Sequence, residues 1–66
     1  MGTQQEVEQH RQTLIDKYLD DYKAIHPDAS SERRKLLDAA ETYVNDRIAQ
    51  SGEKWRFNKV TGNPEL

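Results

Sequence analysis

The sequence contains no cysteine, so neither a disulfide nor a thiolate zinc site can stabilise the fold. Its two histidines, His10 and His26, lie far apart without any spaced ligand pattern around them. We therefore expect no metal and no other cofactor. With 66 residues the chain has room for one domain and a small core. Domains of this size usually need a disulfide, a metal or association with another chain, and only association remains open here.

Long apolar runs and an excess of one charge are also missing. Only 33% of the residues are hydrophobic, and no apolar run is long enough to span a bilayer. Ten basic and 12 acidic residues give a net charge of −2, without the basic excess typical of proteins that coat nucleic acid. The first ten residues, MGTQQEVEQH, lack the apolar centre of a secretory signal. We therefore expect a cytoplasmic protein with no membrane partner.

Glycine and proline are scarce, at three and two residues, and neither interrupts residues 4–26. Apolar side chains recur there with the period of an amphipathic helix and fall on an arc of about 140°. Pro27 ends the pattern, because the residue before a proline is driven out of the helical region. The sequence predicts a helix over about 4–26. Its apolar side consists of Val7, Leu14, Ile15, Tyr18, Leu19, Tyr22 and Ile25.

A second helical pattern follows a short turn rich in capping residues and is expected from about Ser31 to Gln50. Ser51 and Gly52 end it, with glycine where a left-handed cap is favoured. The short connection predicts that the two helices form an antiparallel hairpin. The apolar arc of the second helix is about 180° wide, which is more than one neighbouring helix covers. It consists of Leu36, Leu37, Ala40, Tyr43, Val44 and Ile48, with Ala39 at its edge.

The last segment, residues 52–66, changes character. Trp55 and Phe57 alternate with polar residues, a pattern too short to make a sheet alone, and residues 61–64 carry a turn signal. We expect an ordered aromatic start and a frayed end. The predicted fold class is all-α, a single domain over 1–66 in which an antiparallel two-helix hairpin carries a short extended aromatic C-terminal tail.

Two ways of covering the wide apolar arc remain open. Two hairpins can form a symmetric homodimer, a four-helix bundle, which the small size of the chain slightly favours. Alternatively, the tail folds back so that Trp55 and Phe57 complete a monomeric core.

Each apolar arc contains one arginine, Arg11 in the first helix and Arg47 in the second. If the hairpin turns about residue 28, both arginines gather at its open end, where Trp55 and Phe57 also emerge. Their stems can cover apolar surface, or their guanidinium groups can stack on Trp55. The alternative is an anchor for a protein partner, since arginine and aromatic residues are enriched at interface hot spots. The candidate partner-binding residues are Arg11, Arg47, Trp55, Phe57, Tyr18, Tyr22 and Tyr43.

The start of the second helix is basic, although the helix dipole disfavours cations there. Serine hydroxyls and free amides beside basic side chains can hold a phosphate. A solvated basic collar, paired locally with Glu32 and Asp38, is the simpler interpretation, because exposed ion pairs of this kind are nearly neutral energetically. The candidate residues for phosphate or nucleic acid are Ser30, Ser31, Arg33, Arg34 and Lys35.

The sequence offers no catalytic constellation. Asp16, Asp20 and Asp21 lie mainly on the polar side of the first helix, and no histidine stands near a serine nucleophile and an orienting acid. The hypothesis that fits these features is a non-enzymatic interaction module, an accessory or inhibitor-type regulator that docks on a larger protein. Two alternatives stay open: weak binding of nucleic acid or phosphate, and a small structural subunit of a larger assembly.

Overall fold

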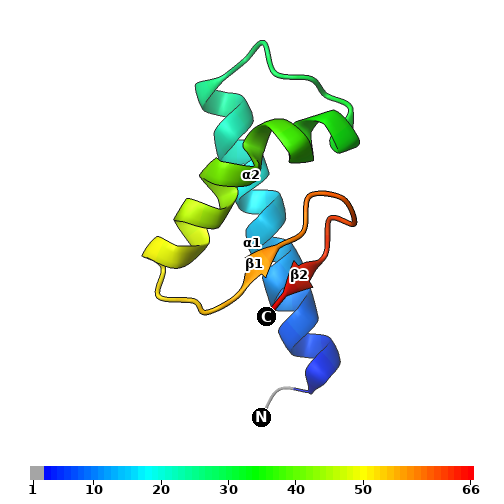
Figure 1. The fold of residues 1–66 in the computed structure, drawn as a ribbon, viewed down its shortest axis with the longest axis vertical. Coiled ribbons are helices and arrows are strands. Elements are labelled where there is room, and N and C mark those ends of the chain that lie inside the picture. The colour runs from blue at the N-terminus through cyan, green and yellow to red at the C-terminus, as the bar shows by residue number, and fades with distance from the viewer. Residues whose placement is uncertain (1–2) are drawn as a thin grey trace.

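The computed structural model describes residues 3–66 and contains two helices followed by a very small sheet (Figure 1). Helix α1 comprises Gln4–Ile25 and helix α2 comprises Arg33–Gln50. Strands β1, Arg56–Phe57, and β2, Pro64–Glu65, pair in antiparallel fashion. The mostly helical, hairpin-like arrangement is confirmed. The all-α prediction is corrected, because the tail forms this two-stranded sheet.

Local side-chain chemistry explains where α1 begins and ends. The Thr3 hydroxyl accepts a hydrogen bond from the Glu6 backbone N–H at 3.2 Å, which satisfies one of the free amides of the first turn. At the other end, His26 has left the helical region with φ −122° and ψ 79°, as expected for a residue that precedes Pro27.

Helix α2 begins two residues later than the sequence pattern predicts. The Ser30 hydroxyl accepts from the Glu32 backbone N–H at 3.1 Å and holds residues 30–32 in a turn instead of a helical coil. At the C-terminal end, Gly52 has a φ of 81°, the left-handed conformation that glycine adopts without steric cost. The predicted glycine cap is therefore present.

The two helices cross instead of lying side by side along their whole length (Figure 1). At the start of α2, Arg33 Nη2 donates to Asp16 Oδ1 at 3.0 Å. Just after its end, the hydroxyls of Tyr18 and Ser51 are 2.9 Å apart. Both ends of an 18-residue helix thus contact the same short stretch of α1. The alignment of the two helices expected from a hairpin that turns about residue 28 is wrong. The wide apolar side of α2 packs partly on α1 and partly on the tail.

The tail folds back over the helices through a tight turn. Arg56 pairs with Glu65 and Phe57 with Pro64 in the sheet. The Asn58 side-chain oxygen accepts from the backbone N–H groups of residues 60 and 61 at 2.8 and 3.3 Å, and so shapes the turn. The end that was expected to be frayed therefore takes part in strand pairing through residues 64–65.

The hydrophobic core lies where α1, α2 and the start of the tail meet. Trp55 and Phe57 are only 6% and 2% exposed, so the tail supplies the third wall of the core within a single chain. The Phe57 backbone N–H donates to Asn45 Oδ1 at 3.0 Å, which ties β1 to α2. The buried core residues are Ile15, Tyr18, Leu19, Leu36, Leu37, Ala40, Val44, Ile48, Trp55 and Phe57.

Candidate functional site

Arg47 lies over the ring of Tyr18, with its guanidinium carbon 5.5 Å from the ring centroid. The Tyr18 ring is buried, and its hydroxyl is hydrogen-bonded to Ser51 at 2.9 Å, so the ring is fixed from both sides. Arg47 itself is exposed and forms no ion pair among residues 3–66. Its stem thus covers the core edge while its N–H groups stay available to an outside acceptor.

Arg11 forms a second stack of the same kind, 5.7 Å from the centroid of the Trp55 ring. The indole N–H of Trp55 donates to Glu53 at 3.2 Å, and Glu53 in turn lies 3.8 Å from His10. Stacking of an arginine on Trp55 is one of the two arrangements that the sequence predicts, and Arg11 makes this contact. The structure therefore places the two arginines on different rings instead of in one cluster.

Tyr22 and Tyr43 extend the surface next to Arg47. Their ring centroids are 5.7 Å apart, and the His26 ring lies 4.6 Å from Tyr22. Both tyrosines are half-buried. Among residues 3–66 their hydroxyls have no hydrogen-bond partner, in contrast to the hydroxyl of Tyr18. Since Tyr43 and Arg47 are neighbours at i and i+4 on α2, we name Tyr22, His26, Tyr43 and Arg47 the tyrosine–arginine face.

The remaining predicted partner-binding residues lie beneath the surface. Trp55, Phe57 and Tyr18 belong to the core, so they support the arginines and offer a partner little surface of their own. His26 was not among the predicted binding residues. The sequence feature that could have identified His26 as part of this surface is its position four residues after Tyr22, because residues at i and i+4 meet on one side of a helix.

The basic start of α2 is largely engaged within the chain. Arg33 pairs with Asp16 at 3.0 Å, and Lys35 lies 3.6 Å from Glu32. The Ser31 hydroxyl accepts from the Lys23 ammonium group at 3.2 Å, and the Ser30 hydroxyl is occupied by the backbone. Within residues 3–66, Arg34 is the cation of this segment that has no ion-pair partner.

Lys59 connects the tail turn to α2. Its ammonium group lies 3.0 Å from Asp38 and 3.6 Å from Glu41. The hydrogen bond and charge of Asp38, followed by the charge of Glu41, raise the pKa of Lys59 above the usual 10.5. This ion-pair cluster links the turn to α2 at the surface.

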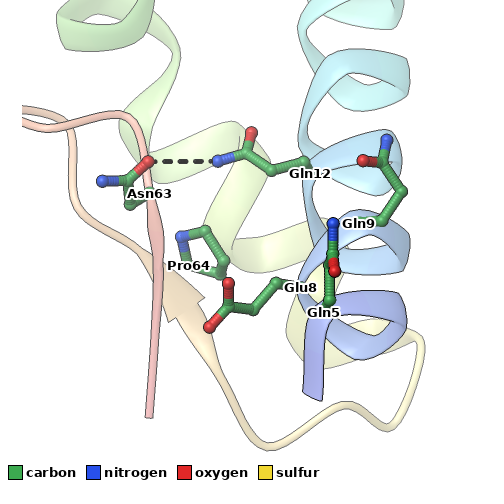
Figure 2. Close-up of a pocket in the computed structure, with 6 residues that line it drawn as sticks. All are labelled: Gln5, Glu8, Gln9, Gln12, Asn63 and Pro64. Atoms are coloured by element: carbon green, nitrogen blue, oxygen red, sulfur yellow. Dashed lines mark hydrogen bonds between the residues drawn. The ribbon is translucent and has the colours of Figure 1, made fainter. Parts of the chain in front are cut away.

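The hollows along the described chain are surface grooves. One of about 450 Å³ lies between the N-terminal turns of α1 and strand β2 and has a mostly amide lining (Figure 2). Gln12 crosses it and donates to Asn63 Oδ1 at 3.2 Å and to the Gly62 carbonyl at 3.3 Å. This contact fixes the tail against α1. No group of three or more metal-ligating side chains is assembled within residues 3–66.

Comparison with known proteins adds no relative. No protein-family model, curated protein or solved structure matches the chain. Over residues 3–66, neither helix is long and apolar enough to cross a membrane. The functional interpretation therefore rests on the geometry of the chain itself.

Proposed function

We propose that this protein is a non-enzymatic interaction module, an accessory or inhibitor-type regulator that docks on a larger protein through the tyrosine–arginine face. The supporting observation is the pair Tyr22 and Tyr43, which are half-buried, in ring contact and free of internal hydrogen bonds at their hydroxyls within the described chain. Tyrosine and arginine dominate interface hot spots, since they combine a large apolar area with polar groups at the rim.

The chemistry of this face defines what it accepts. Tyr22 and Tyr43 present hydroxyls, and Arg47 presents guanidinium N–H groups above a fixed ring. A partner that offers a carboxylate or a backbone carbonyl beside an apolar side chain would satisfy both parts of the face. Because Arg47 is held by Tyr18 before binding, little side-chain entropy is lost when the complex forms.

The test is affinity purification of the tagged protein and of two variants. The double variant Tyr43→Ala with Arg47→Gln removes the α2 half of the face and changes none of the buried core residues. We expect it to lose the partner that the wild type captures, with an affinity at least about tenfold lower, because hot-spot truncation costs more than about 1 kcal/mol. Arg34→Gln, which removes an exposed cation elsewhere on α2, is the matched control and should keep the partner.

The proposal fails if the folded double variant retains every captured protein. Circular dichroism of both variants establishes that they are folded. If the Arg34→Gln variant loses the captured protein to the same extent as the double variant, binding depends on general charge attraction and not on a defined docking face.

Binding of nucleic acid or phosphate through the start of α2 stays an alternative proposal. It is weakened by the internal contacts of Arg33, Lys35, Ser30 and Ser31. Titration with labelled DNA and RNA at 50 and 200 mM salt decides it, because binding through phosphates must fall steeply with salt. The role of a small structural subunit is the third alternative, in which the same face would be permanently covered.

A further inference from the structure

The small sheet has two outer edges, and an amide side chain from a helix lies at each of them. On β1, the Phe57 backbone N–H points away from β2 and donates to Asn45 Oδ1 at 3.0 Å, so α2 closes this edge. On the side of β2, Gln12 of α1 donates from Nε2 to the Gly62 carbonyl at 3.3 Å. The edge of β2 is not closed along its length, because it borders the groove of about 450 Å³ that separates it from the N-terminal turns of α1 (Figure 2).

The strand pairing shows which backbone groups of β2 face this groove. The Asn58 N–H donates to the Asn63 carbonyl at 2.9 Å, so the carbonyl of Asn63 faces β1. Neighbouring residues of a strand direct their backbone groups to opposite edges, and the Pro64 carbonyl therefore faces the groove. Proline has no backbone N–H. At Pro64 the outer edge of β2 thus offers an acceptor and no donor.

The opposite wall of the groove is built from side chains of α1, and residues 62–66 run alongside it (Figure 2). Gln5 and Gln9 are exposed, and their side-chain amide groups form no hydrogen bond among residues 3–66. They lie about one helical turn apart, or about 6 Å along α1, which is close to the spacing of about 7 Å between alternate residues of an extended chain. An extended chain between the two walls finds a carbonyl acceptor on β2 and amide donors on α1.

We propose that this groove binds an extended peptide segment of another protein as a short third strand along β2. One peptide N–H donates to the Pro64 carbonyl, and peptide carbonyls accept from the amide groups of Gln5 and Gln9. Main-chain pairing of this kind is a recurring way in which sheet edges recognise extended peptides. The β2 edge of a second copy of this chain is a poor occupant, because it also lacks a donor at Pro64.

The charges around the groove determine which side chains the peptide carries. Glu8 lines the groove, and Glu6 lines a second hollow of about 450 Å³ that shares Gln5 and Gln9 with the first. Among the described residues, neither a cation nor an aromatic ring lines either hollow. A phosphate backbone is therefore repelled and a nucleobase finds no ring on which to stack. A segment with lysine or arginine beside the paired residues is attracted, so the bound peptide is basic.

Titration of the ¹⁵N-labelled full chain with a synthetic peptide of alternating lysine and valine, blocked at both ends, tests this proposal. In NMR spectra we expect saturable shift changes at residues 5–12 and 62–66, with a dissociation constant of about 1 mM or lower. A copy of the peptide that is N-methylated at its central residues keeps the charge but loses the N–H donors, and should bind at least about tenfold more weakly. A copy with glutamate in place of lysine should also bind at least about fivefold more weakly, because Glu8 and Glu6 repel it.

Gln9→Ala removes one amide group from the wall of α1 and should weaken binding of the lysine–valine peptide about three- to tenfold. Gln50→Ala is the matched control, since Gln50 is an exposed glutamine of α2 outside the groove, and it should leave the affinity unchanged. Alanine is a strong helix former, so both variants keep their helices.

Three results would each overturn the proposal: no saturable shift change with the lysine–valine peptide, equal binding of its N-methylated copy, or equal affinities of Gln9→Ala and Gln50→Ala. The groove shares no residue with the tyrosine–arginine face. Any of these results therefore leaves the proposed docking function standing.

Discussion

Single residues determine how this small core is sealed at its edges. Arg11 and Arg47 occupy places in apolar arcs, where a charge would be costly if it were desolvated. Each lies over an aromatic ring, Trp55 or Tyr18, so the ring is covered while the guanidinium group keeps contact with water. The contact with a ring restricts the conformations of each arginine side chain, so less conformational freedom is lost on binding.

Gly62 is the residue at which the tail turn tolerates least change. Its φ is +75°, and a Cβ built there would lie 3.2 Å from Leu37 Cδ1. Gly62→Ala therefore adds both backbone strain and a close contact with the core. We expect a loss of about 2 kcal/mol in the free energy of unfolding, measured by urea denaturation.

Gly52 provides the matched control for this prediction. Its φ of +81° carries the same backbone cost, but a Cβ there would meet nothing within 4 Å. Gly52→Ala should therefore lose only about 1 kcal/mol. Equal losses in the two variants would show that the contact with Leu37 is relieved by a small movement and does not constrain the turn.

At the scale of elements, the helices were predictable and their crossing was not. The helical period and Pro27 locate α1 within one residue, because hydrophobic period and backbone geometry are local properties. Strands β1 and β2 have two residues each, too few for an alternating pattern to be recognised. Their pairing depends on the turn that Asn58 shapes and on the contact of Phe57 with Asn45, which joins residues that only the fold brings together.

The tail turn contacts α2 through the ion pairs of Lys59, and any stabilisation from them should depend on pH. Because the pKa of Lys59 in the folded chain lies above the usual 10.5, its stabilising contribution is complete below pH 10.5 and is lost as the pH rises through the folded value. The difference in stability between the wild type and Lys59→Gln should therefore be constant from pH 7 to about 10 and vanish above the folded pKa. Urea denaturation at a series of pH values measures it.

Lys54→Gln serves as the control, since Lys54 is exposed and forms no ion pair among residues 3–66. Its stability difference should be close to zero at neutral pH. If Lys59→Gln is as stable as the wild type at pH 7, the ion pairs with Asp38 and Glu41 are too solvated to hold the turn.

At the scale of the whole molecule, the sequence predicted three of the four residues of the tyrosine–arginine face, all but His26, but not how they are used. The arginines and tyrosines stand out as misfits or amphipathic residues in an apolar arc, and this is visible without a structure. The crossing of α1 and α2 determines which aromatic ring each arginine covers. The tail matters too, because one of these rings, that of Trp55, belongs to it. The exposure of Val7 and Ile25 was hidden for the same reason, since both belong to the apolar arc and only the fold shows that α2 leaves them uncovered.

The tail should accordingly be indispensable for folding. A chain that ends at Ser51 loses Trp55 and Phe57, each of which is more than nine-tenths buried. Removal of one such side chain typically costs about 3–5 kcal/mol, and the total stability of a small domain is about 5–15 kcal/mol. We expect the shortened chain to lose its cooperative thermal transition and most of its helical circular dichroism signal.

A chain without Leu66 alone is the control, because this side chain is 91% exposed and should contribute little. It should melt within a few degrees of the full chain. A chain ending at Ser51 that melted at the same temperature would mean that α1 and α2 form a stable core without a third wall. The wide apolar side of α2 would then be covered by another copy of the hairpin, and the melting temperature of the shortened chain would rise with its concentration.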